Sequence, residues 1–153
     1  MHAGERILLT LWIGGMWTVG YVVVPTLFDM LDSRILAGAI AGRLFTIISG
    51  IGILSAVVLI AGQLLWASVP WRRNWRLGVL AGMLVILLIG QFGLQPQMAA
   101  LKAAGLADPA SAAAFGRLHG ISSALFLVNS LLGLVLVIFG LGERAASKGS
   151  RRE

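Results

Sequence analysis

Residues 44–71 read "LFTIISGIGILSAVVLIAGQLLWASVPW", and this stretch contains no aspartate, glutamate, lysine or arginine. A helix of about 20 apolar residues crosses the roughly 30 Å hydrocarbon core of a bilayer, so the stretch is long enough to span a membrane once. Three further stretches are also uncharged and long enough to span: Ile7–Phe28, Leu77–Leu101 and Leu118–Gly142. The sequence therefore predicts four transmembrane segments.

Composition and backbone chemistry both favour helices for these segments. The chain of 153 residues is 58% hydrophobic and 12% charged, with a mean hydropathy of +0.93. A soluble domain carries about 25% charged residues. Inside a bilayer, backbone groups pair only within a helix or a closed barrel, and these stretches lack the two-residue alternation of barrel strands. We expect an all-α, polytopic membrane protein built as a four-transmembrane-helix bundle.

The predicted organisation is one transmembrane domain, residues 1–142, followed by a basic cytoplasmic tail, residues 143–153. Asp108-Pro109 is a typical helix start, because aspartate caps the first amides and proline fits the first helical position. Asp32-Ser33 can start a helix in the same way. The predicted helices cover about residues 6–31, 34–68, 75–104 and 109–142.

The distribution of basic residues predicts the orientation. With four spans, both termini and the loop "WRRNWR" (residues 71–76) lie on one side of the membrane. That side carries eight lysines and arginines and the other side four, so the positive-inside rule places both termini in the cytoplasm and the protein in the inner membrane. The net charge of +6 lies mostly at helix ends, where it suits a lipid bilayer as partner rather than nucleic acid.

The two halves of the chain look alike. Each contains an apolar helix, a proline, a polar loop and a Gly-Arg-Leu step before the next apolar helix. Arg43 follows Pro25 by 18 residues, and Arg117 follows Pro96 by 21 residues. The pattern predicts two repeated helical hairpins, related by an axis along the membrane normal. The alternative is that the two hairpins are alike only because any membrane hairpin of helices meets the same physical constraints.

Polar residues gather near the predicted outer boundary of the membrane. Counting 1.5 Å per residue places Arg43 and Arg117 about one turn outside the hydrocarbon. If these side chains converge, they form either an entrance for an ion or ligand, or a belt of ion pairs that closes the bundle. Arginines that extend to lipid headgroups are a further interpretation. The members of this outer polar cluster are Asp29, Asp32, Arg43, Gln95, Gln97, Arg117 and His119.

Two amide side chains lie deeper, Gln91 and Asn129, and either bond between helices or line a polar path. His119 is the only histidine within a predicted span, so haem binding through His119 is a weaker alternative. With no cysteine, the chain has no disulfide and no thiolate metal site. No catalytic motif is present, and we expect a role other than catalysis.

Three stretches carry a family resemblance: "LWIGGMWTVGYVVVPTLF" (residues 11–28), "LAGAIAGRLF" (36–45) and "FGRLHGISSALFLVNSLLGLVLV" (115–137). They resemble the transmembrane-protein-205-like family (domain of unknown function 4149) of small four-helix membrane proteins. A eukaryotic relative linked to platinum-drug resistance implies export or trafficking of a metal complex. A looser similarity to haem-linked four-helix membrane proteins implies redox chemistry, but residues 8–11 lack the histidine those proteins carry before a Trp-Gly motif.

Three functional hypotheses follow. Transport of a small solute or metal complex predicts a wet path past Gln91 and Asn129, and a homo-oligomer. A structural or partner-binding membrane module predicts a dry, packed interior. A haem- or quinone-linked oxidoreductase component predicts that His119 faces one cavity together with the aromatic stripe formed by Trp17, Tyr21 and Phe28.

The four-span topology gives a direct prediction. Reporter fusions at Gly105 and Ser147 should report opposite sides of the membrane, with Ser147 in the cytoplasm, because an odd number of spans separates each turn at the outer face from the C-terminus. Alkaline phosphatase and green fluorescent protein fusions measure this. Both positions in one compartment would contradict the topology.

Overall fold

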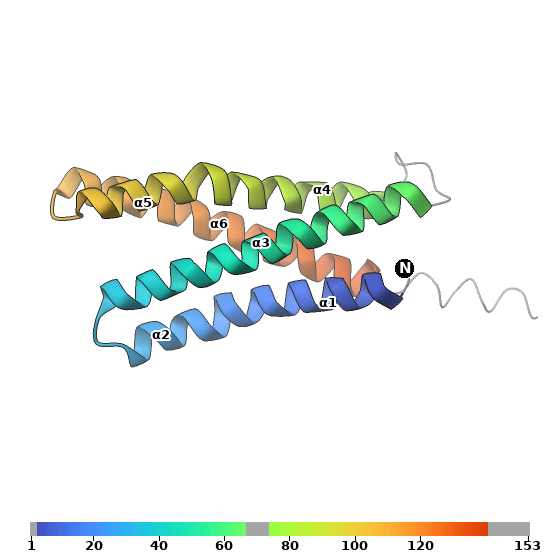
Figure 1. Ribbon diagram of the computed structural model, residues 1–153, viewed down its shortest axis with the longest axis horizontal. Helices are drawn as coiled ribbons and strands as arrows, with labels where there is room; N and C mark the ends of the chain where they lie inside the picture. Colours follow the sequence, from blue (N-terminus) through green and yellow to red (C-terminus); the bar gives the residue numbers. More distant parts are fainter. Residues whose placement is uncertain (1–2, 67–73, 141–153) are drawn as a thin grey trace, which may run out of the picture.

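The computed structural model describes residues 3–66 and 74–140, which form four long helices (Figure 1). The ends predicted for the second and fourth helices, and the basic tail, fall outside these residues. Two of the four helices are each made of three consecutive segments. The segments are α1 (Ala3–Trp17), η1 (Thr18–Val23) and α2 (Val24–Met30); α3 (Arg34–Trp66); α4 (Trp75–Leu88), η3 (Ile89–Leu94) and α5 (Gln95–Ala104); and α6 (Pro109–Gly140).

The predicted fold class is confirmed. The described parts of the chain contain helices and no strand, and all four helices are long and apolar enough to cross a membrane. The protein is therefore a multi-pass membrane protein. The candidate spans are Gly4–Met30, Arg34–Leu65, Trp75–Ala104 and Pro109–Phe139.

The helix ends follow from local chemistry. Asp108 caps α6, since its Oδ2 accepts a hydrogen bond from the Ser111 backbone N–H at 2.9 Å, and Pro109 is the first helical residue. The Ser33 hydroxyl accepts from the Leu36 backbone N–H at 3.2 Å and starts α3 in the same way. The helix through α5 stops at Gly105, whose φ of +94° suits a residue without a side chain.

The two prolines do not end their helices. Proline lacks an N–H and its ring clashes with the carbonyl four residues earlier, so each helix widens into a π-helix, η1 or η3, that ends two residues before Pro25 or Pro96. The next side chain then bonds the carbonyl four residues back. Thr26 Oγ1 donates to the Val22 carbonyl at 2.7 Å, and Gln97 Nε2 donates to the Gly93 carbonyl at 2.8 Å.

The helices form two hairpins, residues 3–66 and 74–140. Figure 1 shows the α2–α3 and α5–α6 turns, here called the tips, at one end of the molecule. The start of α1 and the end of α6 lie at the other end, here called the base. Within each hairpin α2 packs on α3 and α5 packs on α6, whereas the hairpins meet mainly through α3 with α4 and through α1 with α6. Neither α2 nor α5 makes extensive contact with the opposite hairpin.

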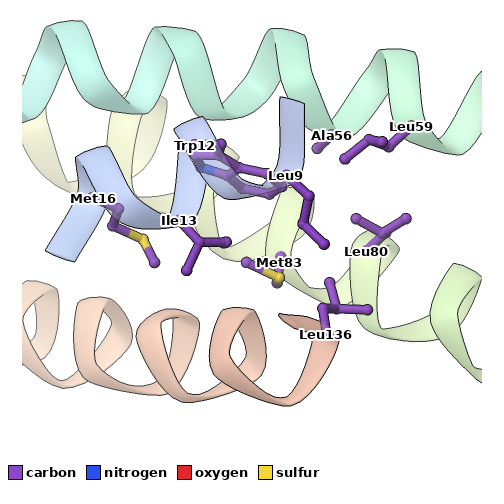
Figure 2. Packing of buried hydrophobic residues seen from close by; sticks show 9 residues of the cluster. All are labelled: Leu9, Trp12, Ile13, Met16, Ala56, Leu59, Leu80, Met83 and Leu136. Atoms are coloured by element: carbon purple, nitrogen blue, oxygen red, sulfur yellow. The ribbon is translucent and has the colours of Figure 1, made fainter. Parts of the chain in front are cut away.

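The hydrophobic core lies in the half of the bundle nearer the base (Figure 2). Trp12 is its largest residue and is 1% exposed. By contrast, η1 and α2 contain no buried residue. The hairpins are therefore held together toward the base and packed less closely toward the tips. The core cluster contains Leu9, Trp12, Ile13, Met16, Ala56, Leu59, Leu80, Met83 and Leu136.

The two hairpins repeat in packing as well as in sequence. Leu9 and Trp12 are buried in the first hairpin, and Leu80 and Met83 are buried 71 residues later in the second. The same interval separates η1 from η3 and Pro25 from Pro96. The burial pattern and the side-chain bonds after the prolines therefore support the predicted repeat.

One close contact in the core depends on a glycine, Gly52. A Cβ added at Gly52 would lie 2.6 Å from Trp12 Nε1 and 2.9 Å from Leu87 Cδ1, while a Cβ at Gly50 would meet nothing within 4 Å. Small residues let helices approach closely where lipid removes the hydrophobic driving force. Gly52 thus sets how closely α3 approaches α1 and α4.

Gly52→Ala should destabilise the bundle by about 1–3 kcal/mol, because the core must shift to admit the methyl group. Gly50→Ala on the same helix should be neutral or slightly stabilising, since alanine has the higher helix propensity. Thermal unfolding in detergent measures both. Equal melting temperatures for the two variants would contradict the packing described.

Candidate functional site

The outer polar cluster predicted from the sequence is divided between the hairpins. Asp29, Asp32 and Arg43 belong to the first hairpin and are exposed. In the second hairpin, Arg117, His119 and Gln97 are exposed and Gln95 is half-buried. All lie in the half of the molecule toward the tips. Among the described residues, neither Arg43 nor Arg117 lies within the 4.0 Å salt-bridge distance of an aspartate.

The two arginines point away from the hairpin contacts. On α3, Ala37 and Ala41 are buried, and Arg43 stands two residues after Ala41. Two residues turn a helix by about 200°, so Arg43 lies on the opposite face. Arg117 stands likewise two residues after the half-buried Phe115. This placement favours arginines that extend to headgroups and water rather than a belt of ion pairs.

His119 forms part of a surface stack on the second hairpin. Its ring lies 5.9 Å from the Phe115 ring at an interplanar angle of 10°, and Lys102 Nζ lies 5.3 Å from the centre of the same Phe115 ring. The described residues contain no group of three or more His, Asp or Glu side chains that could hold a metal ion. His119 therefore stands beside an aromatic ring and a cation rather than beside other metal-binding side chains.

Trp17 and Tyr21 of the aromatic stripe form ring contacts that lead to the opposite hairpin rather than to His119, whereas Phe28 lies beside Gly38 of its own hairpin. The Trp17 and Tyr21 rings are 5.4 Å apart, and Tyr21 lies 5.6 Å from Phe126 on α6. Phe45 of α3 lies 5.3 Å from the same Phe126 ring. Gly20 lies against Phe126 so closely that a Cβ there would clash with the ring. This aromatic contact lies between the core and the tips.

Buried polar groups form the more informative site. Asn129 is 1% exposed, and its Nδ2 donates to the Met16 sulfur at 3.6 Å, which joins α6 to α1. Its Oδ1 has no hydrogen-bond partner, and neither has the hydroxyl of the fully buried Ser130. Gln91, in η3, has an unpartnered and buried Oε1. We call Gln91, Asn129 and Ser130 the interior polar site.

Sequence reasoning found two of these three residues and missed Ser130. Serine is common in helices that pack closely in membranes, so its type gives no signal by itself. Its position next to Asn129 in an otherwise apolar run was the available clue.

The unpartnered atoms carry an energetic cost. A buried polar atom without a partner costs about 1–3 kcal/mol, and native proteins contain few of them. Three such atoms are expensive against a total stability of about 5–15 kcal/mol. Water or a ligand that donates hydrogen bonds would remove the cost. The site offers two carbonyl oxygens and one hydroxyl, so it can accept hydrogen bonds without presenting a charge.

The chain belongs to a family whose members share a domain of unknown function (DUF4149), because residues 7–107 match the family model. The match runs from α1 to the turn after α5, and the predicted family membership is confirmed. Arg117, His119, Asn129 and Ser130 lie beyond the matched residues, on α6. No curated protein and no solved structure matches the chain.

The cap of α6 gives a pH prediction for the tips. The Ser111 backbone N–H, and then the Ser111 hydroxyl, hold the pKa of Asp108 below its usual value. Because folding lowers this pKa, the stability that the carboxylate gives to the start of α6 is complete above about pH 3.9 and is lost as the pH falls through the lowered folded value. The Ser111 amide chemical shift, followed between pH 2 and 6, should titrate with a midpoint below about 3.9. A midpoint at or above that value would contradict the cap.

Proposed function

We propose that the protein carries a small solute across the membrane along the interface between its two hairpins. The observation that carries this proposal is the interior polar site. Asn129 touches Met16 of the opposite hairpin, so its unpartnered Oδ1 lies where the hairpins meet, and η3, which carries Gln91, contacts α6. Polar residues within a membrane are costly, and they commonly mark the path of a substrate.

A route from the tips to this site is supported by the distribution of contacts. Gln95 is half-buried and lies one helical turn from Gln91 toward the tip of the second hairpin. Neither α2 nor α5 packs extensively across to the opposite hairpin. A solute that entered between the tips would meet Gln95 first, then Gln91, and finally Asn129. The sequence places the membrane boundary about one helical turn after Arg117, and counting 1.5 Å per residue from there puts Asn129 about 12 Å deep.

The route ends at the core. Leu9, Trp12 and Met83 are almost completely buried between the interior polar site and the base. Passage therefore requires the hairpins to part there. Transporters built from two repeats commonly move one repeat against the other around a central site, and the repeated hairpins suit that motion.

The π-helices supply positions where this motion can occur. η1 and η3 interrupt the regular helix at equivalent places, each next to a proline and each at the level between the core and the tip. Sharp bends in helices occur mostly at prolines and π-bulges, and π-bulges are frequent at functional sites. Bending at both places would move α2 and α5 without disturbing the packing of α1 on α3 and α6.

The tightly packed core gives some support to a second candidate, a structural or partner-binding module. In either case we propose a homo-oligomer, because four helices alone enclose little space. Gly116 and Gly120 are exposed with open space beside them, which would let a helix of another copy approach α6.

Flux measurements decide between the two candidates. Purified protein in liposomes should accelerate entry of at least one solute from a panel of glycerol, urea and potassium chloride, followed by stopped-flow light scattering. The double variant Met30→Cys/Leu106→Cys, bridged by a bis-maleimide, should lose this rate because the tips can no longer separate. The two single variants, treated alike, are the controls and should retain it. Flux equal to that of protein-free liposomes for the whole panel would favour the structural module.

A further inference from the structure

Asn129, Ser130 and Gln91 each have a buried side-chain oxygen without a hydrogen-bond partner. We infer that they bind a neutral solute that donates hydrogen bonds, such as a polyol or an amide. The inference takes its access route from the proposed function, but the site itself rests on burial and on the unpartnered atoms.

The unpaired oxygens of the site favour a ligand that donates hydrogen bonds. A carboxamide oxygen only accepts hydrogen bonds, and both Asn129 Oδ1 and Gln91 Oε1 lack a donor. Asn129 Nδ2 is engaged only with the Met16 thioether at 3.6 Å, and thioether sulfur is a weak acceptor. A hydroxyl or amide from a solute would satisfy these oxygens, and a solute oxygen would replace the sulfur as acceptor for Nδ2. The Met16 sulfur thus lies where an oxygen of the solute would be a stronger hydrogen-bond acceptor for Asn129 Nδ2.

The charge of the surroundings excludes an ion as the preferred ligand. The stretches Leu77–Leu101 and Leu118–Gly142, which contain the whole site, have no aspartate, glutamate, lysine or arginine. An ion there would meet no counter-charge, and burial of an unpaired ion costs far more than burial of a hydroxyl. A neutral solute exchanges its bonds with water for bonds to the three side chains.

Comparison of the two hairpins shows that helix packing alone does not require polar side chains at positions 129 and 130. The number of residues that separates Arg43 from Arg117 also separates Ser55 from Asn129 and Ala56 from Ser130. These residues therefore occupy equivalent positions in the two hairpins. Ala56 is fully buried, so the fold accepts an apolar residue where the second hairpin has Ser130. Ser55 has no buried unpartnered oxygen, whereas Asn129 has one. The unsatisfied polar pair is therefore confined to the second hairpin, which is the behaviour of a binding site rather than of a repeated helix contact.

Side-chain amide NMR tests binding directly, because the chain contains only two asparagines, Asn74 and Asn129. Asn74 donates to Gln63 Oε1 at 2.8 Å outside the site and serves as the internal control. In the full-length protein labelled with ¹⁵N-asparagine in nanodiscs, glycerol and acetamide should shift the Asn129 side-chain signals to saturation and leave those of Asn74 in place. Choline chloride should shift neither. Parallel shifts of both asparagines, or none at Asn129, would overturn the inference.

Variants separate binding from a structural role. Ser130→Ala and Asn129→Leu remove unpartnered groups, so their thermal stability should be equal to or above that of the wild type, while glycerol flux is lost. Ser55→Ala, buried at the equivalent position of the first hairpin, should keep both properties. Reduced stability in Ser130→Ala and Asn129→Leu, or undiminished glycerol flux in both, would overturn the inference. Saturable shifts at Asn129 without flux of any solute would leave the site standing and refute the transport proposal.

Discussion

Every backbone amide in the hydrocarbon must find its partner within its own helix, and this constraint determines how the chain accommodates its two prolines. Pro25 and Pro96 each remove a donor in the part of a span that lies toward the tips. Each helix has a π-helical segment before the proline. After the proline, a side chain donates a hydrogen bond to a backbone carbonyl, Thr26 to Val22 in one hairpin and Gln97 to Gly93 in the other. The same solution at both positions shows that the constraint, rather than one particular neighbour, sets the local geometry.

Close packing decides where the hairpins hold together. Lipid is as apolar as leucine, so contact between helices in a membrane depends on shape. Three glycines provide it. Gly52 receives Leu87 of the opposite hairpin beside Trp12 of its own, Gly133 receives Ile13 and Gly20 receives Phe126. All three contacts lie between the base and the tips rather than at the tips themselves. Beyond Gly20, each hairpin packs mainly on itself, because α2 packs on α3 and α5 packs on α6. The tips, with their charged residues, are left exposed to water and headgroups.

Much of this architecture could be predicted from the sequence. Long uncharged stretches indicate membrane spans because charges are costly in lipid, and Asp108-Pro109 marks the start of α6 because capping depends on neighbouring residues alone. The π-helices could not be predicted, since a proline signals disruption without specifying how the helix absorbs it. The direction of Arg43 and Arg117 was also beyond the sequence, because the buried face of a helix that is apolar all round is set by its neighbours. Asn129 was found by its type, whereas Ser130 became informative only once its burial and missing partner were known.

The central claim is that, in the absence of solute, the hairpins are held to each other at the base and separable at the tips. The absence of native cysteine lets spin labels be placed without other changes to the chain. Pulsed electron resonance distances in nanodiscs would compare a base pair, Ile7→Cys with Ile138→Cys, and a tip pair, Met30→Cys with Leu106→Cys. All four residues are exposed. The account predicts one narrow distance distribution for the base pair and a broad one for the tip pair. A tip pair as narrow as the base pair, or a broad base pair, would contradict it.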